Sequence, residues 1–143
     1  MTHDARIIPR LHDGNFARET AGDPVLVVFS APTKCPKCPL QVPAIEEADA
    51  RGIPIFHVDV EKPDAQKTAA SRPRRIMTMK NKDGSKGEPA LVPDFAVPAH
   101  YVYANGCAVA RLTGLSDVED LEGLYEHGVR VASLGALGRP YWP

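Results

Sequence analysis

A run of five apolar residues, Val25–Phe29, predicts a strand that is buried on both faces of a sheet. A short turn follows, after which apolar residues return at the spacing of a helix. These residues are Leu40, Ile45 and Ala48. Ile53–Val60 predicts the next strand, and it is parallel to the first because a helix crosses between them. The first half of the chain therefore predicts a strand–helix–strand unit.

A β-hairpin is indicated in the last third of the chain. Its strands, Ala99–Ala104 and Cys107–Leu112, are joined by Asn105-Gly106, a dipeptide typical of two-residue turns that need positive φ. Ser116–Glu119 then has the spacing of a capping box, so a helix starts there, and Gly128 is its expected end. The helix has one apolar face, formed by Val118, Leu121, Leu124 and Tyr125.

Shorter elements are expected elsewhere. Ile7-Ile8-Pro9 predicts a brief first strand that ends at the proline, and Asp13 is a candidate N-cap for a short helix after it. Pro63–Ala70 predicts another short helix. The tail, Val129–Pro143, has no clear period, and two outcomes stay open for it: packing through Tyr141-Trp142, or no fixed packing.

The segment Arg72–Val97 is rich in glycine, proline and basic residues. Asn81–Gly84 predicts a turn between two short strands, Arg75–Lys80 and Glu88–Val92. Its six basic residues are Arg72, Arg74, Arg75, Lys80, Lys82 and Lys86. Such a cluster attracts acidic partners, so we expect the segment to act in partner recognition, the alternative being a solvated loop without a role.

The 143 residues fit one domain, 1–143, with a single adequate core. The net charge is −1 and positive and negative residues are interspersed, so the overall charge gives no indication of binding to nucleic acid or an anionic membrane. No apolar run approaches the ~20 residues that cross a bilayer, and the first residues lack the apolar segment of a signal peptide. We therefore expect a cytoplasmic protein with no nucleic-acid or membrane partner.

The candidate chemistry is the pair Cys35 and Cys38, two residues apart, where the first strand gives way to the helix. The first turn of a helix carries unpaired N–H groups and partial positive charge, which stabilise a thiolate. Lys34 and Lys37 add to this field, so Cys35 is the candidate nucleophile and Cys38 the candidate resolving thiol. Pro36 suits the first helical position.

This order of features resembles the thioredoxin family. The resemblance rests on the buried strand, the CxxC, Pro43 five residues after it, and matching segments. These segments are Phe56–Val60, Val97-Pro98, Tyr101–Gly106 and Gly114. It implies a thioredoxin fold, with a mixed four- or five-stranded sheet and helices on both faces. It also implies a thiol–disulfide oxidoreductase without a bound cofactor.

The resemblance further implies that Val97-Pro98 is a cis peptide bond facing the two cysteines. Pro36, Lys37, Val97 and Pro98 are then the expected substrate-binding residues, and protein disulfides the expected partners of a monomer. Electrons would come from a thioredoxin reductase or from glutathione. The connection at 72–97 is much shorter in thioredoxins, so we interpret it as an insertion before the cis-proline strand.

Two departures from the family pattern stand out. Thioredoxins usually hold an aspartate in the strand before the CxxC, where this chain has Val27-Val28-Phe29. Thioredoxins also carry aromatic residues around the motif, whereas Lys34 precedes Cys35 here. Both departures lean toward glutaredoxin-like or divergent redox proteins and leave the rate, the potential and the electron donor open.

Other interpretations of these residues remain. The CxxC could be half of a zinc site, with Cys107 and histidines as further ligands, or the vestige of a non-catalytic adaptor. A glutathione-dependent enzyme is the third possibility. Cys107 alone is most simply a small strand residue, His57 a packed core histidine, and His100, two residues past Pro98, a weaker candidate for the site.

Overall fold

The structure is a computed structural model that describes residues 8–92 and 94–135. A four-stranded mixed sheet lies at its centre, with the strand order β2-β1-β5-β6. Its strands are β1 (Val25–Ser30), β2 (Ile55–Asp59), β5 (Ala99–Ala104) and β6 (Cys107–Thr113). β2 runs parallel to β1, while β5 is antiparallel to β1 and β6 antiparallel to β5. The predicted strands at 25–29, 53–60, 99–104 and 107–112 are therefore confirmed, as are the parallel pairing of β1 with β2 and the hairpin of β5 with β6.

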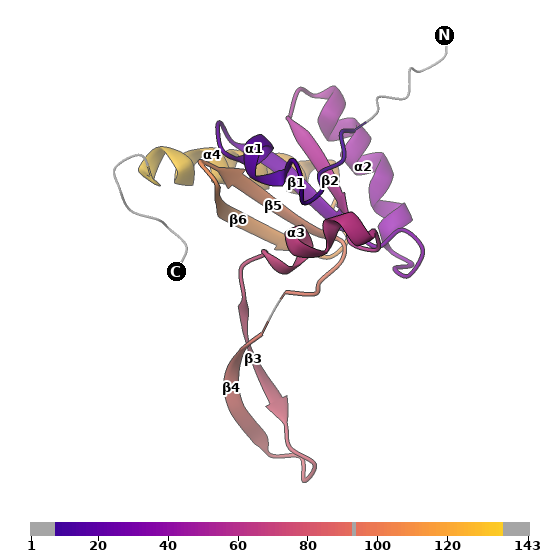
Figure 1. Cartoon of the computed structure of the whole chain (residues 1–143), viewed down its shortest axis with the longest axis vertical. Coiled ribbons are helices and arrows are strands. Elements are labelled where there is room, and N and C mark those ends of the chain that lie inside the picture. Colours follow the sequence, from indigo (N-terminus) through magenta and orange to yellow (C-terminus); the bar gives the residue numbers. More distant parts are fainter. Residues whose placement is uncertain (1–7, 93, 136–143) are drawn as a thin grey trace.

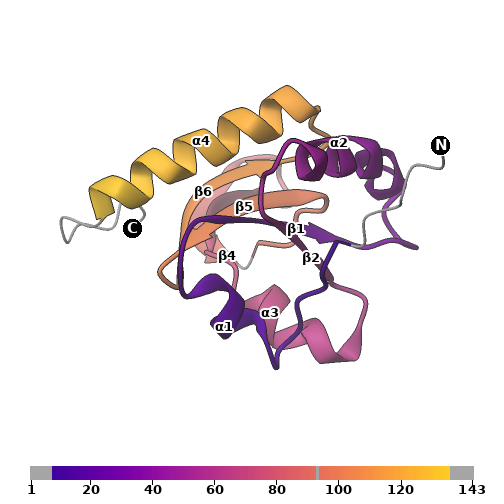
Figure 2. The same ribbon diagram turned by 90° about the horizontal axis from the view of Figure 1, so that it is seen from above.

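Helices cover both faces of this sheet, as predicted. In Figure 2, α2 (Cys38–Ala50) and α4 (Val118–Gly135) lie above it, with α1 (Phe16–Thr20) and α3 (Gln66–Ala70) below. A 3-10 turn, Pro63–Ala65, leads into α3. Each layer has its own apolar core, because side chains alternate between the two faces of a strand. β1 contributes to both cores and is buried along almost its whole length.

The predicted insertion forms a separate two-stranded sheet of β3 (Arg75–Lys80) and β4 (Lys86–Val92). Figure 1 shows this hairpin extending away from the body of the protein. Its turn is closed by a hydrogen bond from the Asn81 N–H to the Ser85 carbonyl, 2.8 Å long. Both strands and the turn were predicted from the sequence.

The second hairpin turn also matches its prediction. Asn105 has φ of 54° and Gly106 has φ of 80°, so both turn residues adopt the left-handed conformation that this dipeptide tolerates. The two residues connect β5 to β6, which pair from Ala99↔Thr113 to Ala104↔Cys107.

The N-terminal caps of α1 and α4 differ from their predictions. Asn15 rather than Asp13 is the N-cap of α1, and the Asp13 carboxylate instead accepts hydrogen bonds from the Thr68 N–H and hydroxyl. The capping box of α4 is formed one residue later than predicted: Asp120 N–H donates to the Asp117 side chain at 2.8 Å, and Asp117 N–H to Asp120 at 3.3 Å. Sequence spacing alone allowed either register.

Gly128 does not end α4, which continues to Gly135. A Cβ at Gly128 would lie 2.5 Å from the Val102 Cγ1, so this glycine allows the helix to approach β5 closely. The chain at 129–135, where no period was recognised, belongs to this helix. Tyr141 and Trp142 lie outside the described residues.

The predicted first strand is absent at Ile8, and Ile7 lies outside the described residues. A single parallel bridge joins Arg10 to His57 instead, one residue beyond the proline. None of the described helices is both long enough and apolar enough to span a membrane.

Candidate active site

Cys35 and Cys38 form a disulfide at the junction of β1 and α2, with their Cα atoms 5.4 Å apart. The prediction that the helix begins at the first cysteine is wrong, because α2 starts at Cys38 with Lys37 as N-cap. Pro39, not Pro36, therefore lies in the first turn, where a missing N–H costs no helical hydrogen bond. Pro43 lies inside the helix, as expected.

The sulfur of Cys35 is nevertheless held against the amino end of α2, because it is bonded to the sulfur of the first helical residue. Cys38 N–H donates to the Cys35 carbonyl at 3.2 Å and closes the turn between them. Both side chains are buried, with 8% of Cys35 and 4% of Cys38 exposed, so Cys38 lies slightly deeper, as predicted. The turn residues between them, Pro36 and Lys37, are exposed.

The loop before Cys35 is held by a carboxylate that the sequence did not single out. Glu61, just after β2, accepts hydrogen bonds from the Thr33 N–H and hydroxyl and from the Lys34 N–H, at 2.8 to 3.2 Å. Desolvation opposes ionisation here, but the bonds from Thr33 and Lys34 prevail and lower the pKa of Glu61. Glu61 thus fixes the approach to Cys35 and adds a negative charge beside it.

The Val97–Pro98 peptide bond is cis, as predicted, and it faces the cysteines. The Cys35 sulfur lies 3.6 Å from the Val97 carbonyl oxygen. Val97 also packs with Val60 against the small apolar cluster that contains both cysteines. Segments 62 residues apart in the sequence therefore meet at the redox pair.

Two opposing influences act on a reduced Cys35. A thiol there would donate its S–H to the Val97 carbonyl, which favours the protonated form. The amino end of α2 favours the thiolate, because the helix dipole places partial positive charge there. Lys34 and Lys37 are exposed, so their charges act through solvent and are screened by salt.

The segment that precedes Val97 is anchored by two buried charged residues. Arg72 donates from Nη1 to the Ala96 carbonyl at 2.7 Å and from Nε to the Ala69 carbonyl at 3.0 Å. Asp94 accepts from the Ala96 N–H at 3.0 Å and from the Tyr101 hydroxyl. Burial opposes ionisation of Asp94, yet these hydrogen bonds lower its pKa, so it stays a carboxylate.

Arg72 also stacks on an aromatic ring of the core, with its guanidinium carbon 4.7 Å from the centroid of Phe29. This contact places a cation on the lower face of β1. Neither Arg72 nor Asp94 was recognised as an anchor: Arg72 is one of several basic residues in its segment, Asp94 belongs to no motif, and only the folded contacts distinguish them.

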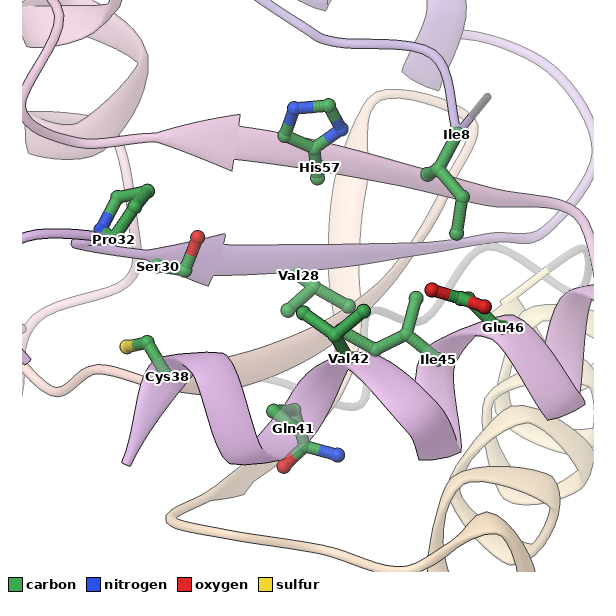
Figure 3. A pocket seen from close by; sticks show the side chains of 10 residues that line it. All are labelled: Ile8, Val28, Ser30, Pro32, Cys38, Gln41, Val42, Ile45, Glu46 and His57. Carbon is green, nitrogen blue, oxygen red and sulfur yellow. The ribbon is translucent and has the colours of Figure 1, made fainter. Parts of the chain in front are cut away.

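A pocket of about 380 Å³ opens beside Cys38, between α2 and the first two strands. Figure 3 shows the Cys38 side chain at one end of it and Ile8 near the other. Its walls are Ile8, Val28, Ser30, Pro32, Cys38, Gln41, Val42, Ile45, Glu46 and His57. Most of this lining is apolar, and Glu46 and His57 supply its titratable groups.

The two histidines near the site differ in their surroundings. His57 is half-buried, and burial lowers its pKa. His100 is fully buried: its Nδ1 lies 3.1 Å from the Leu112 carbonyl, and its Nε2 has no hydrogen-bond partner. Burial lowers the pKa of His100 to about 4, so this ring is neutral at pH 7. Cys107 is a free, exposed thiol at the start of β6.

Of the predicted site residues, Cys35, Cys38, Val97 and Pro98 come together, and Pro36 and Lys37 lie on the exposed turn between the cysteines. Their roles in catalysis and substrate binding stay predictions. Within residues 8–92 and 94–135, no three His, Cys, Asp or Glu side chains gather as metal ligands would.

The sheet order, the helices on both faces and the disulfide before a cis-proline strand define a thioredoxin fold with a CxxC pair. The solved structure of thioredoxin f2 from Chlamydomonas reinhardtii matches it with a TM-score of 0.57 and 15% sequence identity. The match covers 94% of this chain and 98% of the thioredoxin chain, which confirms the predicted fold. No protein-family model and no curated protein sequence matches this chain.

Proposed function

We propose that this protein is a thiol–disulfide oxidoreductase that reduces protein disulfides through the dithiol of Cys35 and Cys38. One observation carries the proposal: the Cys35 sulfur lies 3.6 Å from the Val97 carbonyl, directly before the cis-proline. The redox pair is therefore next to the main chain of half-buried Val97, at which a partner peptide can dock. The thioredoxin fold supports the same class of activity.

In the first step, the Cys35 thiolate attacks one sulfur of the partner's disulfide. A bond forms between Cys35 and that sulfur, the partner's own S–S bond breaks, and its second sulfur leaves as a thiolate that takes up a proton. The amino end of α2 favours this step by stabilising the thiolate before the attack.

In the second step, Cys38 loses its proton and attacks the Cys35 sulfur. The Cys35–Cys38 disulfide forms, and the partner's remaining cysteine leaves as a thiolate. The dithiol has then given two electrons to the partner. Because Cys38 is the first residue of α2, its attack on the neighbouring sulfur requires no rearrangement of secondary structure.

A further thiol must then reduce the Cys35–Cys38 disulfide, and either a thioredoxin reductase or glutathione can supply it. No bound cofactor takes part in these steps. The cytoplasmic location predicted from the sequence favours reduction over oxidation of partners. A non-catalytic adaptor remains the alternative from another class, and a glutathione-dependent enzyme the alternative within this one.

The test is an insulin-reduction assay run separately with thioredoxin reductase and with glutathione as electron donor. The wild-type protein is expected to reduce insulin with one of the two donors. Cys35→Ser should remove the activity, whereas Cys38→Ser should accumulate a mixed disulfide that mass spectrometry detects. Cys107→Ser is the matched control and should retain the full rate. An adaptor would give no reduction with either donor.

A further inference from the structure

The hairpin of β3 and β4, with the preceding Arg74, is an arm that the body of the protein does not cover. The two strands make their contacts chiefly with each other, and the described side chains of β4 are exposed or half-buried. Leu91, an apolar residue of β4, is 63% exposed. An isolated two-stranded hairpin is at best marginally stable in water, so a partner that bound to this arm would stabilise it.

The base of the arm is fixed relative to the redox site. Arg72 and Asp94 lie on the two sides of the base, and both bind the backbone of Ala96. Asp94 is further held by Tyr101 of β5. Val97, whose carbonyl lies next to Cys35, follows Ala96 directly and comes five residues after the arm ends at Val92. The chain that leads out of the arm therefore runs to the redox site.

The charge of the arm is positive and concentrated at its far end. Residues 74–92 contain five basic and two acidic side chains. Lys80 and Lys86 are directly opposite each other across the two strands, and Lys82 lies in the turn between them. The nearby Asp83 is engaged in the turn itself, where it accepts from the Ser85 N–H at 2.9 Å and the Ser85 hydroxyl at 2.6 Å.

Two lysines placed opposite each other destabilise a strand pair, because like charges repel across the ladder. The third lysine, in the turn, adds to this repulsion. An anionic group bound between the three ammonium groups would remove it. A protein that carries a disulfide also carries Asp and Glu side chains, so its own carboxylates can supply this anionic group.

We propose that this basic arm binds an acidic segment of the partner protein and so delivers the partner's disulfide to Cys35. This inference rests on the proposed function and names the substrate class. From Lys86 to Val92 the strand rises about 20 Å at ~3.4 Å per residue, and Val97, beside Cys35, comes five residues after Val92. An extended substrate therefore needs its acidic residues about six to eleven positions from the disulfide, rather than next to it.

The probes are three synthetic peptide disulfides of the same length. One has four glutamates six positions from the disulfide, one has the four glutamates adjacent to it, and one has four glutamines at the distant position. An uncharged small disulfide, bis(2-hydroxyethyl) disulfide, reports the intrinsic chemistry. At about 0.02 M ionic strength we expect kcat/KM for the distant-glutamate peptide to exceed the glutamine peptide about tenfold. At about 0.5 M salt the difference should disappear.

The variant Lys80→Gln/Lys82→Gln/Lys86→Gln should lose this preference and keep its rate on the uncharged disulfide. It should also be slightly more stable, because the facing charges are gone. Lys62→Gln/Lys67→Gln, which removes two exposed lysines near α3, is the matched control and should retain the preference. Equal rates on the glutamate and glutamine peptides, or a preference that survives the triple substitution, would overturn the proposal.

Binding to anionic phospholipid vesicles or to RNA through the three lysines, without any peptide preference, would also overturn it. Failure of the proposed function has a different signature. In that case the wild-type protein reduces neither the peptides nor the uncharged disulfide, whereas failure of the arm proposal leaves reduction of the uncharged disulfide intact.

Discussion

Val28 of β1 and His100 of β5 are directly opposite each other in the antiparallel pair. Their side chains therefore point to the same face of the sheet, the one that α2 covers. His57 of β2 is opposite Val28 on its other side. The row that crosses the sheet beneath the redox helix thus consists of His57, Val28, His100 and, on β6, Leu112, and holds no carboxylate.

This row predicts a simple pH dependence. Among the described residues, Asp94 is the only buried carboxylate, and it binds Tyr101 on the opposite face of the sheet. No buried acid can therefore titrate together with Cys38. We expect kcat/KM for an uncharged disulfide, measured from about pH 5 to 9, to show one ionisation, that of Cys35.

The exposed carboxylate that lines the Cys38 pocket provides the control. Glu46→Gln should leave the pH profile unchanged, because Glu46 is open to solvent. A second ionisation that disappears in Glu46→Gln or in His57→Gln would contradict this prediction, and would show that a group of the pocket takes the Cys38 proton.

His100 should make the protein sensitive to acid. Its pKa is about 4 in the folded protein and about 6.5 when unfolded, so the unfolded chain binds a proton first as the pH falls. Its contribution to stability is complete above pH 6.5 and is lost on acidification toward pH 4. The linkage amounts to about 3 kcal/mol of unfolding free energy by pH 4.

Urea unfolding at several pH values measures this effect. His100→Gln should make the free energy of unfolding depend less on pH between pH 6.5 and 4. It should also cost some stability at pH 7, since the ring is fully buried and its Nδ1 lies next to the Leu112 carbonyl. An unchanged slope in His100→Gln would show that other groups cause the acid sensitivity.

The sequence predicted most of the fold, because its signals are strong and local. The continuous apolar run at Val25–Phe29 and the turn at Asn105-Gly106 each have one structural solution, and both were correct. The CxxC and Val97-Pro98 were placed together through the resemblance to thioredoxins. Their contact across 62 residues of sequence is not contained in any local pattern.

The errors in the sequence predictions have a common cause. The local sequence signals allowed more than one structure, and tertiary contacts determined which one forms. Ser116–Glu119 and Asp117-Val118-Glu119-Asp120 both have the spacing of a capping box, and the second is used. Gly128 resembles a helix stop but instead makes room for Val102. The role of Glu61 depends on the position of the loop before Cys35, which no sequence motif specifies.

Alkylation should distinguish the two active cysteines. The comparison requires the Cys107→Ser background, because Cys107 is exposed and would also react. In the reduced protein below pH 8 we expect Cys35 to be labelled before Cys38, because the Cys38 side chain is less exposed and Cys35 is the proposed nucleophile. Peptide mapping by mass spectrometry reads the order. Faster labelling of Cys38 would reverse the assigned roles.

The close approach of α4 to β5 gives the last prediction. A methyl group at Gly128 would lie 2.5 to 2.8 Å from three carbons of Val102, a distance that side-chain movement cannot relieve because Val102 is buried in the core. Gly128→Ala should therefore destabilise the protein by about 1–3 kcal/mol in urea unfolding, although alanine favours a helix.

Gly123 is the matched control, since it lies in the same helix and a Cβ there meets nothing within 4 Å. Gly123→Ala should stabilise the protein by about 0.5–1 kcal/mol, because only the helix propensity changes. The double variant Gly128→Ala/Val102→Ala should recover part of the loss relative to the sum of its single variants, because the smaller side chain makes room for the new methyl group. If the two substitutions instead prove additive, the helix does not pack against β5 at this point.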